Sequence, residues 1–527
     1  MDINKPMNDY DAVIIGAGHN GLICATSLAR KGRKVLLLEA QDRVGGLGAT
    51  REFYPGFKAT VAHSIGHLPA HIVSDFDLDK YGLEVTSEPL NMIGLDKNGN
   101  HVHVNDNGVS GVGKEDNDAY SEYSRLMNRF ADTLKPFWLK GIPDIDAGNF
   151  ERFISFGHMG WKLRRLGKED MREFFRIVSL PTRDLMDENF NNELLKAVLS
   201  WDGLIGSALA PRSPNAAVLT LLYRMTRNYN GLRSHIVPKG GVAGLIRSLE
   251  HAATAAGVEI RTSTPVKRIA VEGGETGLSA AGVEIDGGET IRARAVISSA
   301  DPCRTFLELL GARHLEIGFS HRIKRMRCKG YVAKLHLALD DIPEFKGLDT
   351  PMGRLIIAAD MDAIEFAYDD AKYGNFSSGP VMEIVIPTMY DSGLAPHGKH
   401  ILSAHVMYAP YTEPAAVDAD AKTDFMNRTI DRIAEFSPGI QKITLHKELL
   451  TPSDLEHEYN LTGGHWHHAE FSMDQMLMMR PTYEAGQYHT PVDGLYLCGA
   501  GSHPGGDITG APGYNAAHRI MAGKKGI

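Results

Sequence analysis

Residues 11–46 have the sequence DAVIIGAGHNGLICATSLARKGRKVLLLEAQDRVGG, and this stretch decides the fold. The apolar run 12–15 predicts a buried strand, and the glycine turn 16–21 follows it directly. A helical pattern then leads to a second apolar run, 35–38, which ends at Glu39. A strand, a glycine turn, a helix, a strand and an acidic residue at these spacings are the fingerprint of a dinucleotide-binding domain.

Each part of this fingerprint has a physical purpose. Gly16 permits the tight turn, Gly18 lets the backbone approach a pyrophosphate, and Gly21 lets the helix lie close to the strand. The helix N-terminus directs free N–H groups at the phosphates, and the Glu39 carboxylate can accept hydrogen bonds from a ribose. The predicted cofactor contacts in this stretch are Gly16, Ala17, Gly18, Asn20, Gly21, Glu39 and Ala40.

The residues after the second strand indicate which dinucleotide binds. Glu39 disfavours a 2′-phosphate and therefore disfavours NADP. Arg43, Gly45 and Gly46 complete an E-x-x-x-R-x-G-G run that resembles the flavoprotein amine oxidase and phytoene desaturase superfamily, where it continues the FAD site. No second GxGxxG follows a strand pattern, so we expect one FAD and no separate nicotinamide domain.

The amino-acid composition bears on the class of protein and on its cellular compartment. The 527 residues are 43% hydrophobic and 23% charged, and the net charge of −9 gives no indication of nucleic-acid binding. The four cysteines are scattered without a CxxC pair, which favours a reducing compartment over a redox dithiol or a zinc knuckle. The N-terminus resembles no signal peptide, and no apolar run reaches 18 residues. We therefore expect a cytoplasmic protein, with peripheral contact at a membrane surface left open.

The order of patterns predicts an α/β fold in which a Rossmann-like FAD-binding domain is interrupted by an α+β substrate domain with a helical insertion. Around Asn98-Gly99, two short apolar runs predict a hairpin, and residues 119–230 have helical periodicity. Residues 333–339 and 400–406 alternate polar and apolar, which predicts half-exposed antiparallel strands. The predicted segments are 1–75, 231–302 and 481–527 for FAD binding, 76–230 for a substrate domain with a helical lid, and 303–480 for the sheet and helices of the substrate domain.

Three groups of residues admit two interpretations each. Residues 153–166 mix bulky apolar side chains with a basic cluster, so they could lie on a membrane surface or form a lid on the protein itself. His63 and His67 could line the site or make structural hydrogen bonds. His465, His467 and His468 invite a metal site, but no carboxylate or cysteine stands at a spacing typical of zinc, so we expect no metal.

The C-terminal run GLYLCGAGSHPGGDITGAPGYNAA, residues 494–517, combines a strand, dense glycine and the start of a helix. Together with VIIGAGHNGL it resembles the phytoene desaturase-related group, which includes carotenoid desaturases and ketolases, and the resemblance spans Asp11 to Ala517. It implies FAD as the cofactor. It also implies that the Val266 backbone pairs with the adenine edge and that the C-terminal run contacts the ribityl chain, the pyrophosphate and the isoalloxazine. The contacts implied there are Gly499, Gly501, Gly510 and Ala511.

The resemblance implies an FAD-dependent oxidoreductase that passes a hydride from a C–C or C–N bond to flavin N5. A largely apolar, carotenoid- or isoprenoid-like small molecule is the expected substrate, with O2 or a quinone as the electron acceptor. His503 and Asp507 are the predicted catalytic residues. Asp507 stands where the family pattern has a small neutral residue, so it could bind a polar or cationic substrate, act as a base, or cap a helix beginning near Ile508.

Two alternatives stay open. The first is an amine or other small-molecule oxidase with Asp507 facing the substrate. The second is a non-redox isomerase or protein-binding factor in which FAD is structural. The sequence indicates no oligomeric state.

Overall fold

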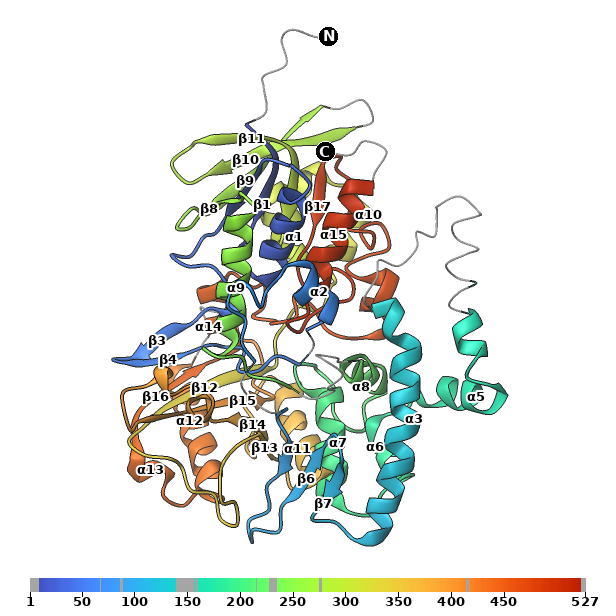
Figure 1. Cartoon of the computed structure of the whole chain (residues 1–527), viewed down its shortest axis with the longest axis vertical. Coiled ribbons are helices and arrows are strands. Elements are labelled where there is room, and N and C mark those ends of the chain that lie inside the picture. The colour runs from blue at the N-terminus through green and yellow to red at the C-terminus, as the bar shows by residue number, and fades with distance from the viewer. Residues whose placement is uncertain are drawn as a thin grey trace.

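The computed structural model describes residues 9–66, 68–85, 89–138, 157, 160–214, 216–226, 235–273, 277–413, 416 and 418–522. Figure 1 shows an elongated molecule with one sheet above the other and a column of helices beside the lower sheet. The chain crosses repeatedly between the two halves, because each sheet draws its strands from stretches far apart in the sequence.

The upper sheet is built on the two apolar runs of residues 11–46. Its strands β8, β2, β1, β11 and β17 are parallel neighbours, and β10 and β9 continue it in antiparallel fashion from β11. The strands are β1 (Tyr10–Ile15), β2 (Val35–Leu38), β8 (Glu259–Arg261), β9 (Val266–Gly273), β10 (Leu278–Ile285), β11 (Thr290–Ser298) and β17 (Leu495–Leu497). The predicted second strand, 35–38, has the same bounds as β2.

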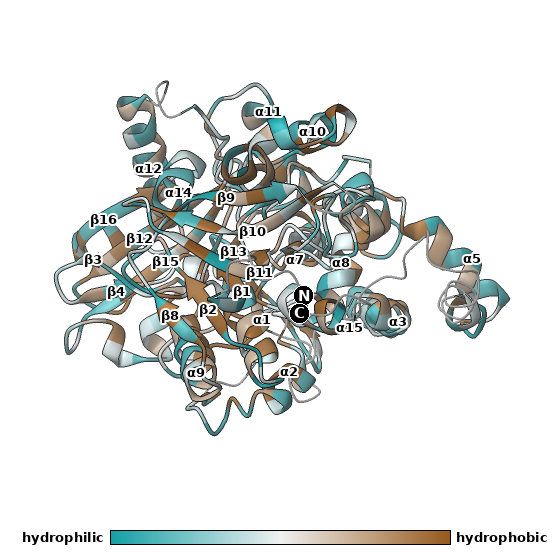
Figure 2. Cartoon of the chain, turned by 90° about the horizontal axis from the view of Figure 1, so that it is seen from above, coloured by the Kyte–Doolittle hydropathy of each residue, from teal (hydrophilic) through white to brown (hydrophobic). Residues whose placement is uncertain are grey.

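Helices cover both faces of the upper sheet. On one face α1 (His19–Ala29) lies between α9 (Val242–Ala255) and α15 (Ala511–Ala522), and their apolar side chains form one buried cluster with the sheet. The helical turn Arg304–Gly311 and α10 (Ile317–Lys324) cover the other face. Figure 2, seen from above, shows the hydrophobic strand β2 inside this arrangement. The core therefore holds the glycine turn rigidly at the end of β1.

The lower sheet has eight strands in the order β16-β12-β15-β14-β13-β5-β6-β7. Strands β5 and β6 form the hairpin predicted around Asn98-Gly99, and they pair as antiparallel neighbours. The strands are β5 (Met92–Gly94), β6 (Val102–Asn105), β7 (Gly108–Ser110), β12 (Val332–Leu339), β13 (Arg354–Ile357), β14 (Met382–Val385), β15 (His400–Met407) and β16 (Thr444–Leu450).

The prediction that residues 333–339 and 400–406 form half-exposed strands is wrong. Both β12 and β15 are buried along nearly their whole length, polar residues included. Their apolar side chains pack under α12 (Ala419–Ala434), whereas Lys334, His336 and His405 alternate onto the other face and are also buried. The side chains of these strands do alternate between two faces, as predicted. Other parts of the chain cover the polar face, however, which the pattern predicted to lie in water.

The helical insertion is confirmed as a layer beside the lower sheet (Figure 1). Residues 153–156, 158 and 159 of the segment 153–166, and His67, lie outside the described residues. None of the helices in the described ranges has both the length and the apolar composition needed to cross a membrane. The remaining elements are α2 (Ala70–Asp75), α3 (Lys114–Trp138), α5 (Lys168–Ile177), α6 (Thr182–Asp187), α7 (Glu193–Leu204), α8 (Ala217–Met225), α11 (Met361–Lys372), α13 (Ile440–Ile443), α14 (Pro452–Tyr459) and the hairpin β3 (Arg51–Tyr54) to β4 (Phe57–Ala59).

Candidate functional site

A cavity of about 330 Å³ runs from the glycine turn at the end of β1 to the polar face of the lower sheet. One end is formed by the carboxyl ends of β1, β2 and β11, where ligands bind in open parallel sheets. The predicted contacts that line this cavity are Gly16, Gly18, Asn20, Glu39, Ala40, Gly45, Gly46, Val266 and Asp507.

The glycine turn has the shape that a pyrophosphate site requires. Gly16 has φ +94°, which favours glycine, and a Cβ on Gly21 would overlap the carbonyl oxygen of Gly16. Gly18 differs, because among the described residues no atom outside its two chain neighbours lies within 4 Å of the position its Cβ would take. The backbone of Gly45 bonds back to the turn through the Ala17 carbonyl at 2.9 Å. The open side of Gly18 therefore faces the cavity.

Glu39 connects the second strand to this turn. Its Oε2 accepts the Ala17 N–H at 2.7 Å, and its Oε1 accepts the Gln41 N–H at 3.0 Å. Burial raises the pKa of the Glu39 carboxyl, and the backbone N–H groups oppose that rise. A carboxylate has about four acceptor positions, so capacity remains on the cavity side for the hydroxyl groups of a ribose.

Some predicted contacts lie behind the wall rather than on it. Gly499 and Gly501 flank Ala500, which lines the cavity, and a Cβ on either glycine would overlap residues 299–302. The two glycines thus act by close packing. The cavity lining also lacks four other predicted contacts, Ala17, Gly21, Gly510 and Ala511. It lacks Arg43 as well, whose side chain is 46% exposed and pairs with Asp42.

The structure separates the two predicted catalytic residues. His503 does not line the cavity; its Nε2 contacts the Phe137 carbonyl oxygen at 2.7 Å, and its ring stacks on Trp138. Asp507 does line the cavity, with φ +63°. The helix-cap alternative for Asp507 is wrong, because α15 begins only at Ala511, where Thr509 Oγ1 accepts the first N–H at 3.1 Å.

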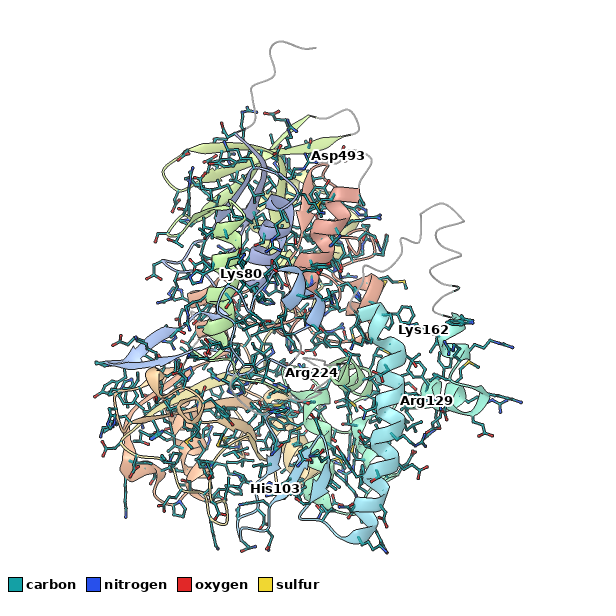
Figure 3. The ribbon with its side chains drawn as sticks, in the orientation of Figure 1. Lys80, His103, Arg129, Lys162, Arg224 and Asp493 are labelled. Atoms are coloured by element: carbon teal, nitrogen blue, oxygen red, sulfur yellow. The ribbon has the colours of Figure 1, made fainter. Side chains whose placement is uncertain are left out.

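Asp507 forms part of a buried ionic group that sequence analysis missed. Arg224 on α8 donates through Nε to Asp507 at 3.2 Å and through Nη1 to the Asp202 carbonyl at 2.8 Å. Arg354 on β13 donates to the Asp202 carboxylate at 2.6 Å and to Glu383 at 2.7 Å. All five residues line the cavity, and Figure 3 shows Arg224 between the two halves of the molecule. No motif marks these residues, since each comes from a different element.

A hydrogen-bonded chain extends from this group into the lower sheet. Glu383 is ionised, because Arg354 outweighs burial and lowers the pKa of its carboxyl to about 2. His63 Nε2 therefore donates to Glu383 at 3.1 Å, and His63 Nδ1 accepts from Lys334 at 2.8 Å. Burial lowers the pKa of both His63 and Lys334 well below their usual values.

His63, Glu383 and His405 together offer ligand atoms within 4.8 Å of one another. Their geometry argues against a metal ion. The rings of His63 and His405 stack at 3.9 Å and only 28° apart, so their in-plane lone pairs do not converge, and His405 Nε2 contacts the Val61 carbonyl at 2.9 Å. Arg354 also occupies the carboxylate of Glu383, which is the one anionic member of the three.

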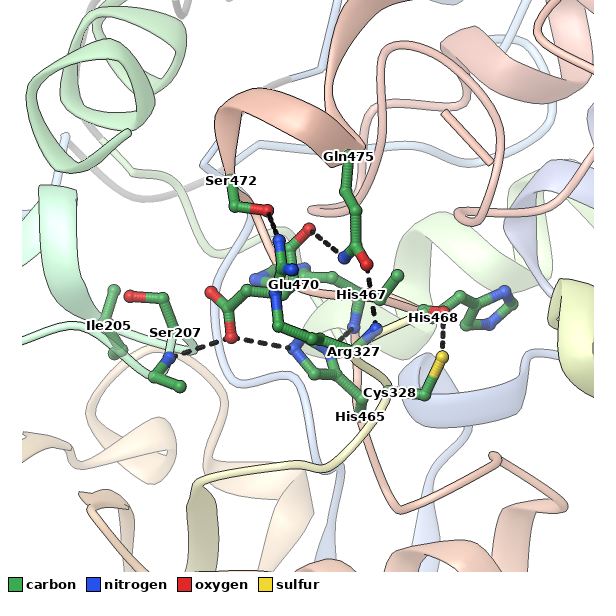
Figure 4. A network of polar contacts seen from close by, with 12 residues as sticks. Ile205, Ser207, Arg327, Cys328, His465, His467, His468, Glu470, Ser472 and Gln475 are labelled. Carbon is green, nitrogen blue, oxygen red and sulfur yellow. Dashed lines mark hydrogen bonds and ion pairs between the residues drawn. The ribbon is translucent and has the colours of Figure 1, made fainter. Parts of the chain in front are cut away.

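The histidine loop 465–468 contributes Trp466, His467 and His468 to the lining of the cavity. Figure 4 shows its anchoring: Glu470 accepts from the Ala208 N–H at 2.9 Å and lies 3.7 Å from His465, and Cys328 contacts the His468 carbonyl. The Asp507 N–H donates to His467 Nδ1 at 3.3 Å, and the cationic guanidinium of Arg224 lies 3.1 Å from Nε2 of the same ring. This arrangement, with burial, keeps His467 neutral and its pKa well below the usual value.

The pH dependence of stability tests this burial. Burial lowers the pKa of His468 to about 4, so between pH 6.5 and 4 the unfolded chain binds more protons and stability falls as the pH decreases. From pH 7.5 to 5.5 this histidine should account for about 1.4 kcal/mol of lost unfolding free energy. We expect His468→Asn, which suits the φ of +64° at this position, to remove that part of the decrease.

Urea unfolding at both pH values with saturating FAD measures the effect. The exposed His457→Asn on α14 is the control, because water reaches that side chain in both states. An unchanged pH slope in His468→Asn would contradict the neutral, buried state of His468.

The residues at the β1 end of the cavity fit FAD. A turn with an open glycine, a helix N-terminus, a buried carboxylate at the end of β2 and the β9 entry at Thr264–Val266 surround one continuous space. Buried Asn20 Oδ1 has no hydrogen-bond partner in the described residues, which leaves an acceptor for a ligand. The group that would fit these residues is a dinucleotide.

Comparisons with known proteins agree with this site. The family model described as flavin containing amine oxidoreductase matches residues 21–521. The chain is 31% identical to pyridine nucleotide-disulfide oxidoreductase domain-containing protein 2 of Rattus norvegicus, over 98% of this chain and 94% of that protein. It is 25% identical to the zeta-carotene-forming phytoene desaturase of Myxococcus xanthus, over 97% and 92% of the two chains. The structure of cyclohexylamine oxidase from Brevibacterium oxydans IH-35A has the same fold, with a TM-score of 0.58, 15% identity and 97% of each chain covered.

Proposed function

Because the chain belongs to the flavin-containing amine oxidoreductase family and is an FAD-dependent oxidoreductase, we propose that it oxidises a small molecule carrying a polar or cationic group beside the reacting C–H bond. The observation that carries this proposal is the charged wall around Asp507. An apolar hydrocarbon would leave these buried ionic groups without the hydrogen bonds that water gives them, which costs free energy.

The described part of this wall carries charges of both signs. Three carboxylates, Asp202, Glu383 and Asp507, face two guanidinium groups, Arg224 and Arg354. The histidines add no compensating charge, since burial keeps the pKa values of His405, His467 and His468 low. A wall with charged and polar groups favours a substrate that itself carries a polar or cationic group, and an amine that loses a hydride from its C–N bond is one such substrate.

Bound FAD supplies a two-electron acceptor at flavin N5. The protein contributes orientation and exclusion of water: Arg224 fixes the Asp507 carboxylate, and Trp466 with Ile205 and Ile508 gives the wall its apolar part. Asp507 then pairs with a substrate ammonium group and accepts its proton before the C–H bond breaks.

A second candidate is the largely apolar, isoprenoid-like substrate that the sequence predicts. The name of one relative, zeta-carotene-forming phytoene desaturase, favours it. Anaerobic mixing of the holoenzyme with amines, oxygenated isoprenoids and hydrocarbon carotenoids distinguishes the two by bleaching of the oxidised flavin. Bleaching by hydrocarbons alone would overturn the polar-substrate proposal. If a panel member were isomerised without bleaching, a non-redox role for FAD would replace it.

For the substrate that bleaches the flavin, Asp507→Asn tests the role of the carboxylate. Asparagine keeps the shape and tolerates φ +63° but removes the charge. We expect KM to rise at least about 10-fold, because one buried charge pair is worth about 1.4 kcal/mol or more. Flavin content should stay unchanged. The exposed Asp493→Asn is the control, and an unaltered KM in Asp507→Asn would exclude the proposed pairing.

A further inference from the structure

A projecting helical segment lies far from the cavity, on the outer side of α3. Residues 160–164 are helical and lead through a turn into α5. Figures 1 and 2 both place α5 at the outer edge of the molecule, away from the two sheets. We call its outward residues the basic–aromatic surface, which consists of Trp161, Lys162, Arg164, Arg165, Lys168, Arg172 and Phe175.

The inner side of this segment already has its packing partners. Leu166, Phe174 and Ile177 are at most 5% exposed, and the Phe174 ring lies 5.4 Å from Phe130 of α3. Arg129 of α3 bonds to the Leu166 carbonyl at 2.6 Å and pairs with Asp170. The fold of the segment therefore needs nothing from its outer face.

The outer face exposes large apolar side chains. Trp161 is 52% exposed and Phe175 is 57% exposed. Single exposed apolar residues are ordinary, but here two aromatic rings stand among cations. The Arg165 guanidinium lies 4.7 Å from the centre of the Trp161 ring.

The charge of this segment is opposite to that of the whole chain. Residues 160–177 contain six Lys and Arg and three Asp and Glu, a net charge of +3 in a protein of −9. The acidic side chains Asp170 and Glu173 are engaged by Arg129 and Arg176. Within the described parts of the chain, no ion pair involves Lys162, Arg164 or Arg165, and the same holds for Lys168 and Arg172. Figure 3 shows Lys162 at the outer edge.

We propose that the basic–aromatic surface binds the protein peripherally to an anionic lipid bilayer. Aromatic rings enter the interface between headgroups and acyl chains, while Lys and Arg extend to the lipid phosphates. Each basic residue near an anionic surface strengthens binding about fivefold. A bilayer also accepts the exposed apolar side chains Trp161 and Phe175, which the phosphates of a duplex nucleic acid would leave in water. The proposal does not depend on the substrate.

Cosedimentation of the holoenzyme with vesicles tests the proposal. One set is phosphatidylcholine alone, and the other contains about 30% phosphatidylglycerol, enough to give a negative surface potential. We expect at least about tenfold stronger binding to the anionic vesicles, decreasing as salt screens the charges. Equal or absent binding to the two sets would overturn the proposal and leave an acidic protein as the partner to seek.

Two double variants separate the contributions. Trp161→Ser with Phe175→Ser should weaken binding at least about fivefold even at low salt, and Arg164→Glu with Arg165→Glu should remove the preference for anionic lipid. The matched control is Phe366→Ser with Tyr373→Ser at α11, whose side chains are 65% and 76% exposed. Flavin content and thermal unfolding should stay unchanged in all three. The assignment of this surface would be contradicted if only the control variant lost binding, or if neither test variant lost binding.

Discussion

Gly18→Val should give a folded apoprotein whose dissociation constant for FAD is raised at least about 100-fold, a loss of about 2.7 kcal/mol in binding free energy. Gly18 precedes α1 with φ −66° and ψ 170°, a conformation that valine adopts without strain. Apart from its two chain neighbours, no residue in the described part of the chain has an atom within 4 Å of its Cβ position. The new side chain would therefore disturb only a ligand whose phosphates approach this backbone.

Fluorescence titration of the apoprotein with FAD measures the affinity, and circular dichroism against temperature measures the fold. Gly439→Val is the matched control, because Gly439 also has open space around its Cβ and φ −86° but lies beside α13, away from the cavity. Gly21→Val should behave differently: its Cβ would overlap the Gly16 carbonyl, so the apoprotein itself should lose about 1–3 kcal/mol. Near-normal FAD affinity in Gly18→Val would remove the glycine turn from the site.

The residues at the nucleotide end of the site could be predicted because they lie close together in the sequence. The strand, turn, helix and strand of residues 11–46 are consecutive, so periodicity and glycine spacing identify Gly16, Gly18 and Glu39 without knowledge of the rest of the chain. The second strand was predicted to the residue for the same reason.

The opposite wall was not predictable in this way. Asp202, Arg224, Arg354 and Glu383 come from α7, α8, β13 and β14, and the tertiary fold alone brings them together. His503 was misjudged because glycine density shows that a segment approaches a ligand but not which way a side chain points. The alternation in β12 and β15 gave the correct faces, yet it could not reveal that the polar face meets the cavity rather than water.

Arg480→Met should be among the most destabilising single changes in the chain. The Arg480 guanidinium is fully buried and donates to five backbone carbonyl groups at 2.6–3.3 Å. Methionine fills much of the space but removes the Arg480 donors from all five carbonyl oxygens, of which that of Glu470 keeps Gln475 Nε2 at 3.2 Å. We expect a loss of about 3–5 kcal/mol, the usual cost of breaking a buried charged network. The carbonyls belong to His467, Ala469, Glu470, Gln475 and Ala500.

Two of these five carbonyl groups belong to residues that line the cavity. His467 and Ala500 line the cavity, so Arg480 joins the histidine loop to the glycine-rich strand end that flanks the cofactor. Flavin should dissociate before global unfolding in Arg480→Met. Arg480→Lys should be intermediate, because an ammonium keeps the charge but offers three donors without the planar fork. Urea unfolding and flavin release measure both effects, with exposed Arg325→Met as the control, expected within about 0.5 kcal/mol. If Arg480→Met retained wild-type stability, the carbonyl network would not be what holds the two walls together.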